Sequence, residues 1–420
     1  MADNGKVRSI KSQVKSIPMH ILLIHQAFTA LNEAGGTRHY EIAAHLIAKG
    51  HRMTIITSPI SYLTGQKSAN SSQKSQTPTS DLRIFRTYAY PALHKSFIHR
   101  VINFFSFMLS SFLKGLQVKR VDLVWGTSPP IFQAVSAWLV ARLKGVPFLF
   151  EVRDLWPAFA IEVGVLKNPI LIKLSLWLER FLYRHADLVV VNSPGYIEHV
   201  KIKGAKHIEM IPNGSDASMF RPQKKGLDLR KKYSLENKFL VVYAGAHGIS
   251  NDLAIILRTA QLLIKNTKIH FILVGDGKEK TALQQKAHEM QLSNLTFTDP
   301  VSKNQMADVL AAADACVAIL KPLELYKTTY PNKVFDYMAD SRPVLLVIDG
   351  VIRKVVEEAK CGLFVQPGNA DDLVKMTIWL SQNKAEAREM GKAGQKYLVD
   401  HFNRIELANK FIKVMEELID

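Results

Sequence analysis

The sequence predicts an α/β protein made of two doubly wound, Rossmann-like domains that face each other across a cleft. The chain has 420 residues, more than a single hydrophobic core usually contains. Short apolar runs alternate with helical patterns along the chain, as they do in βαβ units. This alternation breaks into turn residues at 211–216 and then begins again. We therefore expect two domains of one architecture, with ligands at the carboxyl ends of their strands.

The apolar runs are continuous, which is typical of strands buried on both faces of a parallel sheet. In the first half of the chain they are His20–His25, Met53–Thr57, Leu123–Trp125, Phe148–Val152 and Leu188–Val191. In the second half they are Phe239–Tyr243, Ile269–Val274, Leu295–Phe297, Cys316–Leu320 and Val344–Ile348. A helical pattern from Thr37 to Lys49 completes the first βαβ unit.

The domain boundaries follow from these runs and from local composition. Residues 1–18 are basic and polar and lack the apolar core of a secretory signal, so they are expected to form a disordered leader. The first domain is expected over 19–213 and the second over 214–401. The last segment, 402–420, has the pattern of an amphipathic helix.

Composition narrows the class of partner. A net charge of +18 and a pI of about 9.7 suit nucleic acid, anionic lipid or phosphorylated ligands. The sequence has no zinc-finger spacing, heptad-bearing basic region or aromatic single-strand signature, so no nucleic acid is expected as a partner. Cys316 and Cys361 lie in apolar stretches and are expected to be buried thiols, and no metal site is predicted. No stretch reaches the roughly 18 to 20 apolar residues of a spanning helix, so the expected location is the cytoplasm, with the inner membrane face as an alternative.

Residues 94–120 combine a broad apolar helical face with basic ends. Apolar side chains recur at helical spacing from Ile98 to Leu116, and no charged residue falls between Val101 and Leu113. Such a composition suits a helix lying in the interface of an anionic membrane. A core helix with ordinary basic ends is the alternative.

Paired glycines open the first helical pattern, in the segment Ala34-Gly35-Gly36-Thr37-Arg38. Gly35 and Gly36 allow close approach of the backbone to a bound group, and the N-terminus of a helix attracts phosphate. The full Gly-x-Gly-x-x-Gly spacing is absent, so a dinucleotide site is not indicated. A plain turn capped by Thr37 is the alternative.

Arg153 and Asp154 directly follow a predicted strand, where a pair of side chains would face the cleft. Arg153 could balance a developing phosphate charge, and Asp154 could bind a substrate hydroxyl. A buried Arg–Asp ion pair is the alternative.

Two further glycine turns follow the first two strands of the second domain. Gly245 opens the segment Gly245-Ala246-His247-Gly248, and Gly275 opens Gly275-Asp276-Gly277. Each suits a close backbone approach to a ligand. Ordinary turn chemistry is the alternative for each.

The segment from Pro331 to Ala339 carries the strongest signal. Pro331 near a helix start places Asn332 and Lys333 in the first turn, beside free backbone N–H groups. Lys333 and those amides would grip a diphosphate. Asp336 lies three residues on, and its carboxylate can accept hydrogen bonds from both hydroxyls of a ribose. An ordinary surface pair of Lys333 with Asp336 is the alternative.

Taken together, these segments resemble the family-four glycosyltransferases of the GT-B fold, and among them the bacterial surface-polysaccharide transferases. The resemblance runs from about Met19 to the C-terminus. The matching segments, specific as an ordered set, are Ala34–Arg38, Glu151–Pro157, Ile211–Gly214, Val274–Gly277, Pro331–Ala339 and Arg342–Val344.

The resemblance implies that a sugar is transferred from a nucleotide-diphosphate sugar with retention of anomeric configuration. A UDP-sugar, of N-acetylhexosamine type, is the expected donor, and a lipid-linked or polysaccharide acceptor is expected on the first domain. No metal or other cofactor is implied, and helix 402–420 would return to the first domain. The implied catalytic residues are Arg153, Asp154 and Lys333. The implied donor-binding residues are Gly35, Gly36, Arg38, Gly245, Gly275, Asn332, Lys333 and Asp336.

Several positions depart from the family pattern. The family has two glutamates with seven residues between them, and here Thr328 takes the first place and Asp336 the second. An Arg and a Lys common after the first strand of the second domain are replaced by Ala246 and Asn251. A histidine common in the first domain is replaced by Arg153. The grip on the diphosphate must therefore rest on Lys333, Arg153 or Arg38.

Two other functions remain open at this point. A non-catalytic scaffold that binds nucleotide sugars on a membrane would account for the missing first carboxylate. A nucleotide-sugar epimerase would have a similar two-domain shape, but such enzymes usually carry more carboxylates and histidines in the cleft.

Overall fold

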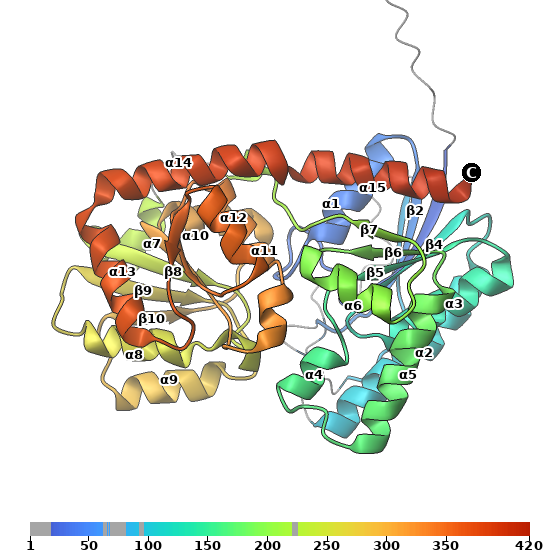
Figure 1. Ribbon diagram of the computed structural model, residues 1–420, viewed down its shortest axis with the longest axis horizontal. Helices are drawn as coiled ribbons and strands as arrows, with labels where there is room; N and C mark the ends of the chain where they lie inside the picture. Colours follow the sequence, from blue (N-terminus) through green and yellow to red (C-terminus); the bar gives the residue numbers. More distant parts are fainter. Residues whose placement is uncertain (1–17, 62–64, 66, 68–80, 92–95, 221–225) are drawn as a thin grey trace, which may run out of the picture.

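The structure is a computed structural model that describes residues 18–61, 65, 67, 81–91, 96–220 and 226–420. Two α/β domains lie side by side along the long axis of the molecule (Figure 1). The leader predicted over 1–18 falls outside the described residues except for Pro18. The predicted fold class of two Rossmann-like domains is confirmed by two separate parallel sheets, each covered by helices.

The first domain is built on a seven-stranded parallel sheet with the order β3-β2-β1-β4-β5-β6-β7. Every strand that the apolar runs predicted is present, because central strands of such a sheet are buried on both faces. Two short edge strands, β3 and β7, were not predicted. The strands are β1 (His20–Ile24), β2 (Arg52–Thr57), β3 (Leu82–Arg86), β4 (Leu123–Ser128), β5 (Phe148–Val152), β6 (Leu188–Val191) and β7 (Ile208–Met210).

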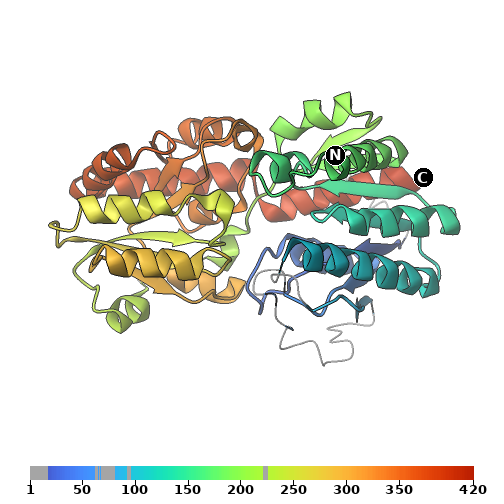
Figure 2. The ribbon, with the colours of Figure 1, turned by 90° about the horizontal axis from the view of Figure 1, so that it is seen from below.

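Helices cover both faces of this sheet. One face packs against α2 (Phe97–Gln117), α3 (Phe132–Lys144) and α5 (Pro169–His185). The other packs against α1 (Arg38–Ala48) and α15 (Arg404–Ile419), the last helix of the chain. The short α4 (Ala158–Glu162) and α6 (Ile197–Ile202) complete the domain. The sheet lies between these two layers in Figure 1, and Figure 2 is seen from the side of α2, α3 and α5.

The second domain has a six-stranded parallel sheet with the order β10-β9-β8-β11-β12-β13. Its strands are β8 (Phe239–Ala244), β9 (Ile269–Val274), β10 (Leu295–Thr298), β11 (Ala315–Ile319), β12 (Val344–Val347) and β13 (Gly362–Phe364). One face packs against α7 (Leu227–Lys232), α10 (Lys303–Ala311), α11 (Asn332–Ala339), α12 (Val351–Glu358) and α14 (Lys384–His401). The other packs against α8 (Ala254–Leu262), α9 (Lys280–Glu289) and α13 (Ala370–Gln382). Cys316 and Cys361 are buried thiols, as predicted.

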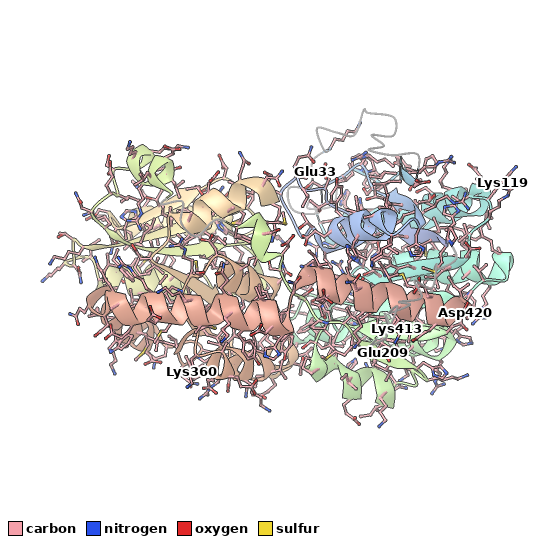
Figure 3. All side chains as sticks on the ribbon, turned by 90° about the horizontal axis from the view of Figure 1, so that it is seen from above. Glu33, Lys119, Glu209, Lys360, Lys413 and Asp420 are labelled. Atoms are coloured by element: carbon pink, nitrogen blue, oxygen red, sulfur yellow. The ribbon has the colours of Figure 1, made fainter. Side chains whose placement is uncertain are left out.

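The chain crosses between the domains twice, and the two crossings pair with each other. The backbone N–H of Ser215 donates to the carbonyl of Phe402 at 3.2 Å, and that of Arg404 donates to the carbonyl of Ser215 at 3.2 Å. A Cβ at Gly214 would lie 2.2 Å from the Phe402 oxygen, so the crossing needs a glycine there. Helices α14 and α15 run on from one domain to the other (Figure 3).

The segment predicted to be either an interfacial or a core helix forms α2, which is buried on one side and exposed on the other. Phe104 and Phe107 are buried against the sheet and α3. On the outer side, Leu109 and Leu113 are 60% and 52% exposed. The helix therefore contributes to the core on one side and leaves a row of large apolar side chains uncovered on the other. No helix in the described part of the chain is long and apolar enough to cross a membrane.

Candidate active site

A cavity of about 1980 Å³ lies between the two domains, at the carboxyl ends of the strands of both sheets. It is lined by every residue singled out in the sequence: Gly35, Gly36, Arg38, Arg153, Asp154, Gly245, Gly275, Asn332, Lys333 and Asp336. Ligand pockets usually measure about 300 to 1,000 Å³. The cavity therefore has room for two substrates side by side.

Two glycine turns of the second domain form one wall of the cavity. Gly245 follows β8 and Gly275 follows β9, both with positive φ, at 152° and 151°. A Cβ at Gly275 would lie only 1.9 Å from the carbonyl oxygen of Gly245. The two turns thus touch each other, and a side chain at Gly275 would force them apart.

Lys333 lies behind these turns with its ammonium group uncompensated by a carboxylate. Its Nζ donates to the Tyr243 hydroxyl at 2.9 Å and lies 4.0 Å from the centre of that ring. A longer contact of 3.4 Å reaches Oδ1 of Asn251. Burial lowers the pKa of Lys333 to about 7, because the charged form loses solvation. No ion pair to Lys333 is formed within the described residues, so an anionic ligand would supply the missing counter-charge.

The N-terminus of α11 faces the same space. Pro331 is its N-cap residue, and no side chain caps the helix. The N–H groups of Asn332 and Lys333 are therefore available to a ligand, whereas that of Val334 donates to the Pro331 carbonyl at 3.2 Å. The helix dipole favours a negative charge at this end. Asn332 and Lys333, its first two residues, both line the cavity.

Asp336 pairs with Lys303 and not with Lys333. Its Oδ1 accepts from Nζ of Lys303 at 2.5 Å and from Oγ of Ser215 at 2.7 Å. The surface pair of Lys333 with Asp336, the alternative interpretation of this spacing, is therefore not formed. Both bonds reach Oδ1, which leaves Oδ2 as the oxygen available to a ligand hydroxyl.

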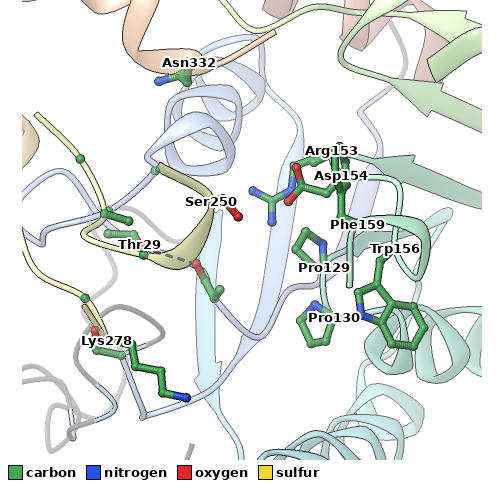
Figure 4. A pocket seen from close by; sticks show the side chains of 18 of the residues that line it. Thr29, Pro129, Pro130, Arg153, Asp154, Trp156, Phe159, Ser250, Lys278 and Asn332 are labelled. Atoms are coloured by element: carbon green, nitrogen blue, oxygen red, sulfur yellow. Dashed lines mark hydrogen bonds between the residues drawn. The ribbon is translucent and has the colours of Figure 1, made fainter. Parts of the chain in front are cut away.

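Arg153 is held at the end of β5 by the neighbouring strands. Its Nε donates to Oγ1 of Thr127 and to the carbonyl of Ser128, each at 3.1 Å. Its Nη2 lies 3.1 Å from Nε2 of His25, at the end of β1. Burial, with the nearby His39 and Arg153 charges, holds the pKa of His25 well below its usual value, so a neutral imidazole accepts this bond. Figure 4 shows the guanidinium pointing into the cavity toward Ser250 of the second domain.

Asp154 points into the cavity beside Arg153 (Figure 4) without forming an ion pair to it. The buried Arg–Asp pair, the alternative for this dipeptide, is thus absent from the described residues. Burial raises the pKa of Asp154 to about 6, and the Arg153 charge partly opposes the rise. At neutral pH the carboxylate is ionised and able to accept a hydrogen bond from a hydroxyl.

Arg38 reaches the edge of the cavity, but its guanidinium is engaged inside the first domain. Nε donates to Glu151 at 2.9 Å, while Nη1 and Nη2 donate to the carbonyls of Pro212 and Ile211 at 2.8 and 2.9 Å. These bonds tie β5 to the crossing between the domains. The geometry gives no support to the diphosphate role predicted for Arg38. Gly35 and Gly36 line the cavity beside it.

Three residues at the site were not found from the sequence. Lys303, Ser215 and His25 contact Asp336 or Arg153 from distant segments of the chain. Ser215 adjoins the Pro-Asn-Gly turn at the crossing, which was the only local signal. In the described ranges, no group of three or more His, Cys, Asp or Glu side chains could hold a metal ion.

Comparison with known families decides the class of protein. Residues 34–214 match the family described as "Glycosyl transferase 4-like domain". Residues 238–383 match "Glycosyl transferases group 1". The chain belongs to the family-four glycosyltransferases of the GT-B fold. This confirms the resemblance drawn from the motifs and favours a glycosyltransferase over the epimerase and the scaffold.

Individual relatives agree with this assignment. The chain is 24% identical over 310 residues to the putative colanic acid biosynthesis glycosyl transferase WcaI of Escherichia coli (strain K12), a match covering 71% of this chain and 76% of the relative. Its fold is similar to that of sucrose-phosphate synthase from Thermosynechococcus elongatus, with a TM-score of 0.75, 18% identity and coverage of 95% and 99% of the two chains. HepE of Anabaena, solved in complex with UDP and glucose, gives a TM-score of 0.71, 14% identity and coverage of 95% and 100%.

Proposed function

We propose that this glycosyltransferase moves a sugar from a UDP-sugar, of N-acetylhexosamine type, to a lipid-linked or polysaccharide acceptor. The transfer retains the anomeric configuration and serves the synthesis of cell-surface polysaccharide. The observation that carries the proposal is the uncompensated Lys333 beside the uncapped N-terminus of α11. A relative named for colanic acid biosynthesis and a structural neighbour that binds UDP support the acceptor and donor classes.

The second domain holds the donor in this proposal. The diphosphate lies between Lys333 and the N–H groups of α11, close to the turns at Gly245 and Gly275. The ribose hydroxyls donate to Asp336, which lies one helical turn farther along α11. As the bond between the anomeric carbon and the diphosphate breaks, negative charge grows on the leaving group, and Lys333 stabilises it.

The first domain holds the acceptor. Asp154 accepts a hydrogen bond from the attacking hydroxyl. The oxygen of this hydroxyl forms the new bond to the anomeric carbon, and its proton passes to an oxygen of the departing diphosphate. Arg153 lies between this hydroxyl and the departing diphosphate and balances the negative charge there. The neutral His25 and the strand-end groups of β4 keep its guanidinium aimed at the cavity.

A lipid-linked acceptor would be reached at a membrane surface. The uncovered apolar row of α2 is flanked by Lys119 and Arg120 at one end, and no acidic residue occurs from 97 to 121. Such a surface would bind the anionic inner face of the cell membrane, and the enzyme would then act from the cytoplasmic side.

The donor site is tested by nucleotide binding. Screening nucleoside diphosphates by thermal stabilisation should give the largest shift with UDP, and GDP serves as the comparison. In the variant Asp336→Ala, affinity for UDP should fall about 10- to 100-fold, since hydrogen bonds to a charged group are worth about 1.5–3 kcal/mol. Affinity for 2′,3′-dideoxy-UDP should not change, because that ligand lacks the two hydroxyls.

The exposed Asp371→Ala provides the matched control, and it should bind both nucleotides as the wild type does. Equal losses of UDP and dideoxy-UDP affinity in Asp336→Ala would contradict the ribose assignment. A wild-type protein that binds no nucleoside diphosphate would contradict the proposed function as a whole.

A further inference from the structure

The cavity does not end at Arg153 and Asp154. It continues away from the second domain into an apolar groove between the first halves of α2 and α5, here called the α2–α5 groove. The groove is lined by Ile98, Ile102, Phe105, Phe132, Trp156, Leu171, Leu174 and Trp177. Neither the donor nor the acceptor hydroxyl accounts for this extension.

The relative lengths of three helices create the groove. Strands β4, β5 and β6 are parallel, so α2, α3 and α5 run in the same direction. The rings of Phe132, at the start of α3, and Phe105, the ninth residue of α2, lie 4.9 Å apart between centres and are tilted by 42°. The rings of Trp138 of α3 and Phe181 of α5 lie 4.8 Å apart. Both α2 and α5 therefore begin well before α3, so their first halves extend past its first turn (Figure 1).

An aromatic floor joins this groove to the reacting centre. Trp156 lies three residues beyond Arg153 and packs against Phe132 at 5.7 Å, and Phe132 in turn packs against Phe105. Pro129 and Pro130 also line the cavity, and Figure 4 shows their rings beside Arg153 and Trp156. A molecule that reached from Arg153 into the groove would therefore meet proline and aromatic rings.

The walls are apolar, exposed and free of negative charge. Ile102 is 45% exposed on α2, and Leu174 and Trp177 are 56% and 61% exposed on α5. No acidic residue occurs from 163 to 178, and Arg153 lines the same cavity where the groove meets the reacting centre. Exposed apolar surface of this kind marks a binding site, and the Arg153 guanidinium at its inner end favours an anionic head group.

We propose that the α2–α5 groove binds the hydrocarbon chain of a phosphate-linked lipid acceptor. The chain lies along the aromatic floor, and the phosphate of the lipid lies toward Arg153. The sugar that carries the attacking hydroxyl then reaches Asp154. This inference rests on the proposed function and names the substrate class of its acceptor side.

Farnesyl diphosphate is a suitable probe, because it combines a hydrocarbon chain with a phosphate and needs no identified acceptor. Its binding is measured from the fluorescence of Trp156 and Trp177, with saturating UDP present to block the donor diphosphate site. The wild type should bind farnesyl diphosphate at least tenfold more tightly than inorganic diphosphate under these conditions.

Two variants of α2 separate its first half, which lines the groove, from its second half, which lies outside the cavity. Ile102→Glu places a charge on the groove wall and should weaken farnesyl diphosphate binding at least tenfold. Leu113→Glu changes a residue of similar exposure on the same helix but outside the cavity, and it should leave binding within about twofold of the wild type. Both variants should keep the wild-type affinity for UDP, which also shows that they fold.

Equal weakening by the two variants would overturn the proposal, because it would indicate adsorption to the apolar surface. Wild-type binding no tighter than that of inorganic diphosphate would overturn it too. If the wild type binds UDP but no farnesyl diphosphate, only the proposed lipid site in the α2–α5 groove is contradicted. If it does not bind UDP, the proposed function is contradicted.

Discussion

Charge balance at individual residues distinguishes the parts of this site. Arg38 and Asp336 have charged partners within the protein, whereas Lys333 has none in the described ranges. A buried charge without a partner is costly to the fold. The buried ammonium group of Lys333 lies beside the N-terminus of a helix, where an anionic ligand would bind. Such a ligand would offset the free-energy cost of the unpaired charge when it binds.

The low pKa of Lys333 leads to a pH dependence of nucleotide affinity. Below pH 7 the ammonium form is present and a diphosphate binds directly. Above about pH 7 the free enzyme has lost this proton, and binding must take one up. Affinity for UDP should therefore fall as pH rises from 7 to 9, by a slope approaching about tenfold per pH unit, measured by titration calorimetry.

The variant Lys333→Met corrects for titration of the nucleotide itself. It should bind UDP weakly with no such fall above pH 7. Its thermal midpoint without ligand should not drop, because the substitution removes an uncompensated charge. A wild-type affinity that is flat from pH 7 to 9 would contradict the assignment of the diphosphate to Lys333.

The site shows how far single residues can be predicted from sequence. Residues close in the chain, such as Lys333 and Asp336, were found because helical spacing places them on one face. The charged partners of Asp336 and Arg38 were not predicted, because Lys303 lies 33 residues from Asp336 and Glu151 lies 113 residues from Arg38. Pairing across such separations is set by the packing of whole domains, which no local pattern encodes.

At the scale of elements, burial decides what the sequence reveals. The central strands are buried on both faces and appear as continuous apolar runs. The missed strands β3, β7 and β13 are edge strands of three to five residues whose side chains are mostly half-buried. Their composition is therefore mixed. Helix α2 shows the opposite problem, because a helix that is apolar on nearly all sides does not indicate which side is covered.

The uncovered side of α2 leads to a prediction about membranes. The double variant Leu109→Glu/Leu113→Glu puts two negative charges on the exposed apolar row. Binding to anionic vesicles in a sedimentation assay should fall at least tenfold, because apolar burial is lost and the lipid head groups repel the new charges. Leu262→Glu, at an exposed leucine of α8 in the second domain, should bind as the wild type does. The absence of wild-type binding, even at low salt, would exclude this surface as a membrane contact.

At the scale of the whole molecule, the donor site and the crossing between the domains share a residue. Ser215 pairs through its backbone with Phe402 and Arg404 at the second crossing, and its hydroxyl donates to Asp336 at 2.7 Å. Arg404 adds a 3.1 Å ion pair to Glu41 of α1 and a 3.3 Å bond to Asn332 of α11. A ligand that engages Asp336 therefore acts directly on the segment about which the domains would rotate.

This connection predicts that binding of the donor nucleotide brings the two domains closer together, and that the Ser215 hydroxyl is needed for the movement. UDP should reduce the radius of gyration of the wild type in small-angle X-ray scattering. Ser215→Ala removes only the hydroxyl and leaves the Lys303 contact to Asp336 in place. It should therefore retain UDP affinity within about tenfold, or about 1.4 kcal/mol, but compact less. Ser218→Ala, an exposed serine three residues on, should behave as the wild type. Equal compaction in Ser215→Ala and the wild type would mean that closure is driven elsewhere, by contacts of the nucleotide with both domains.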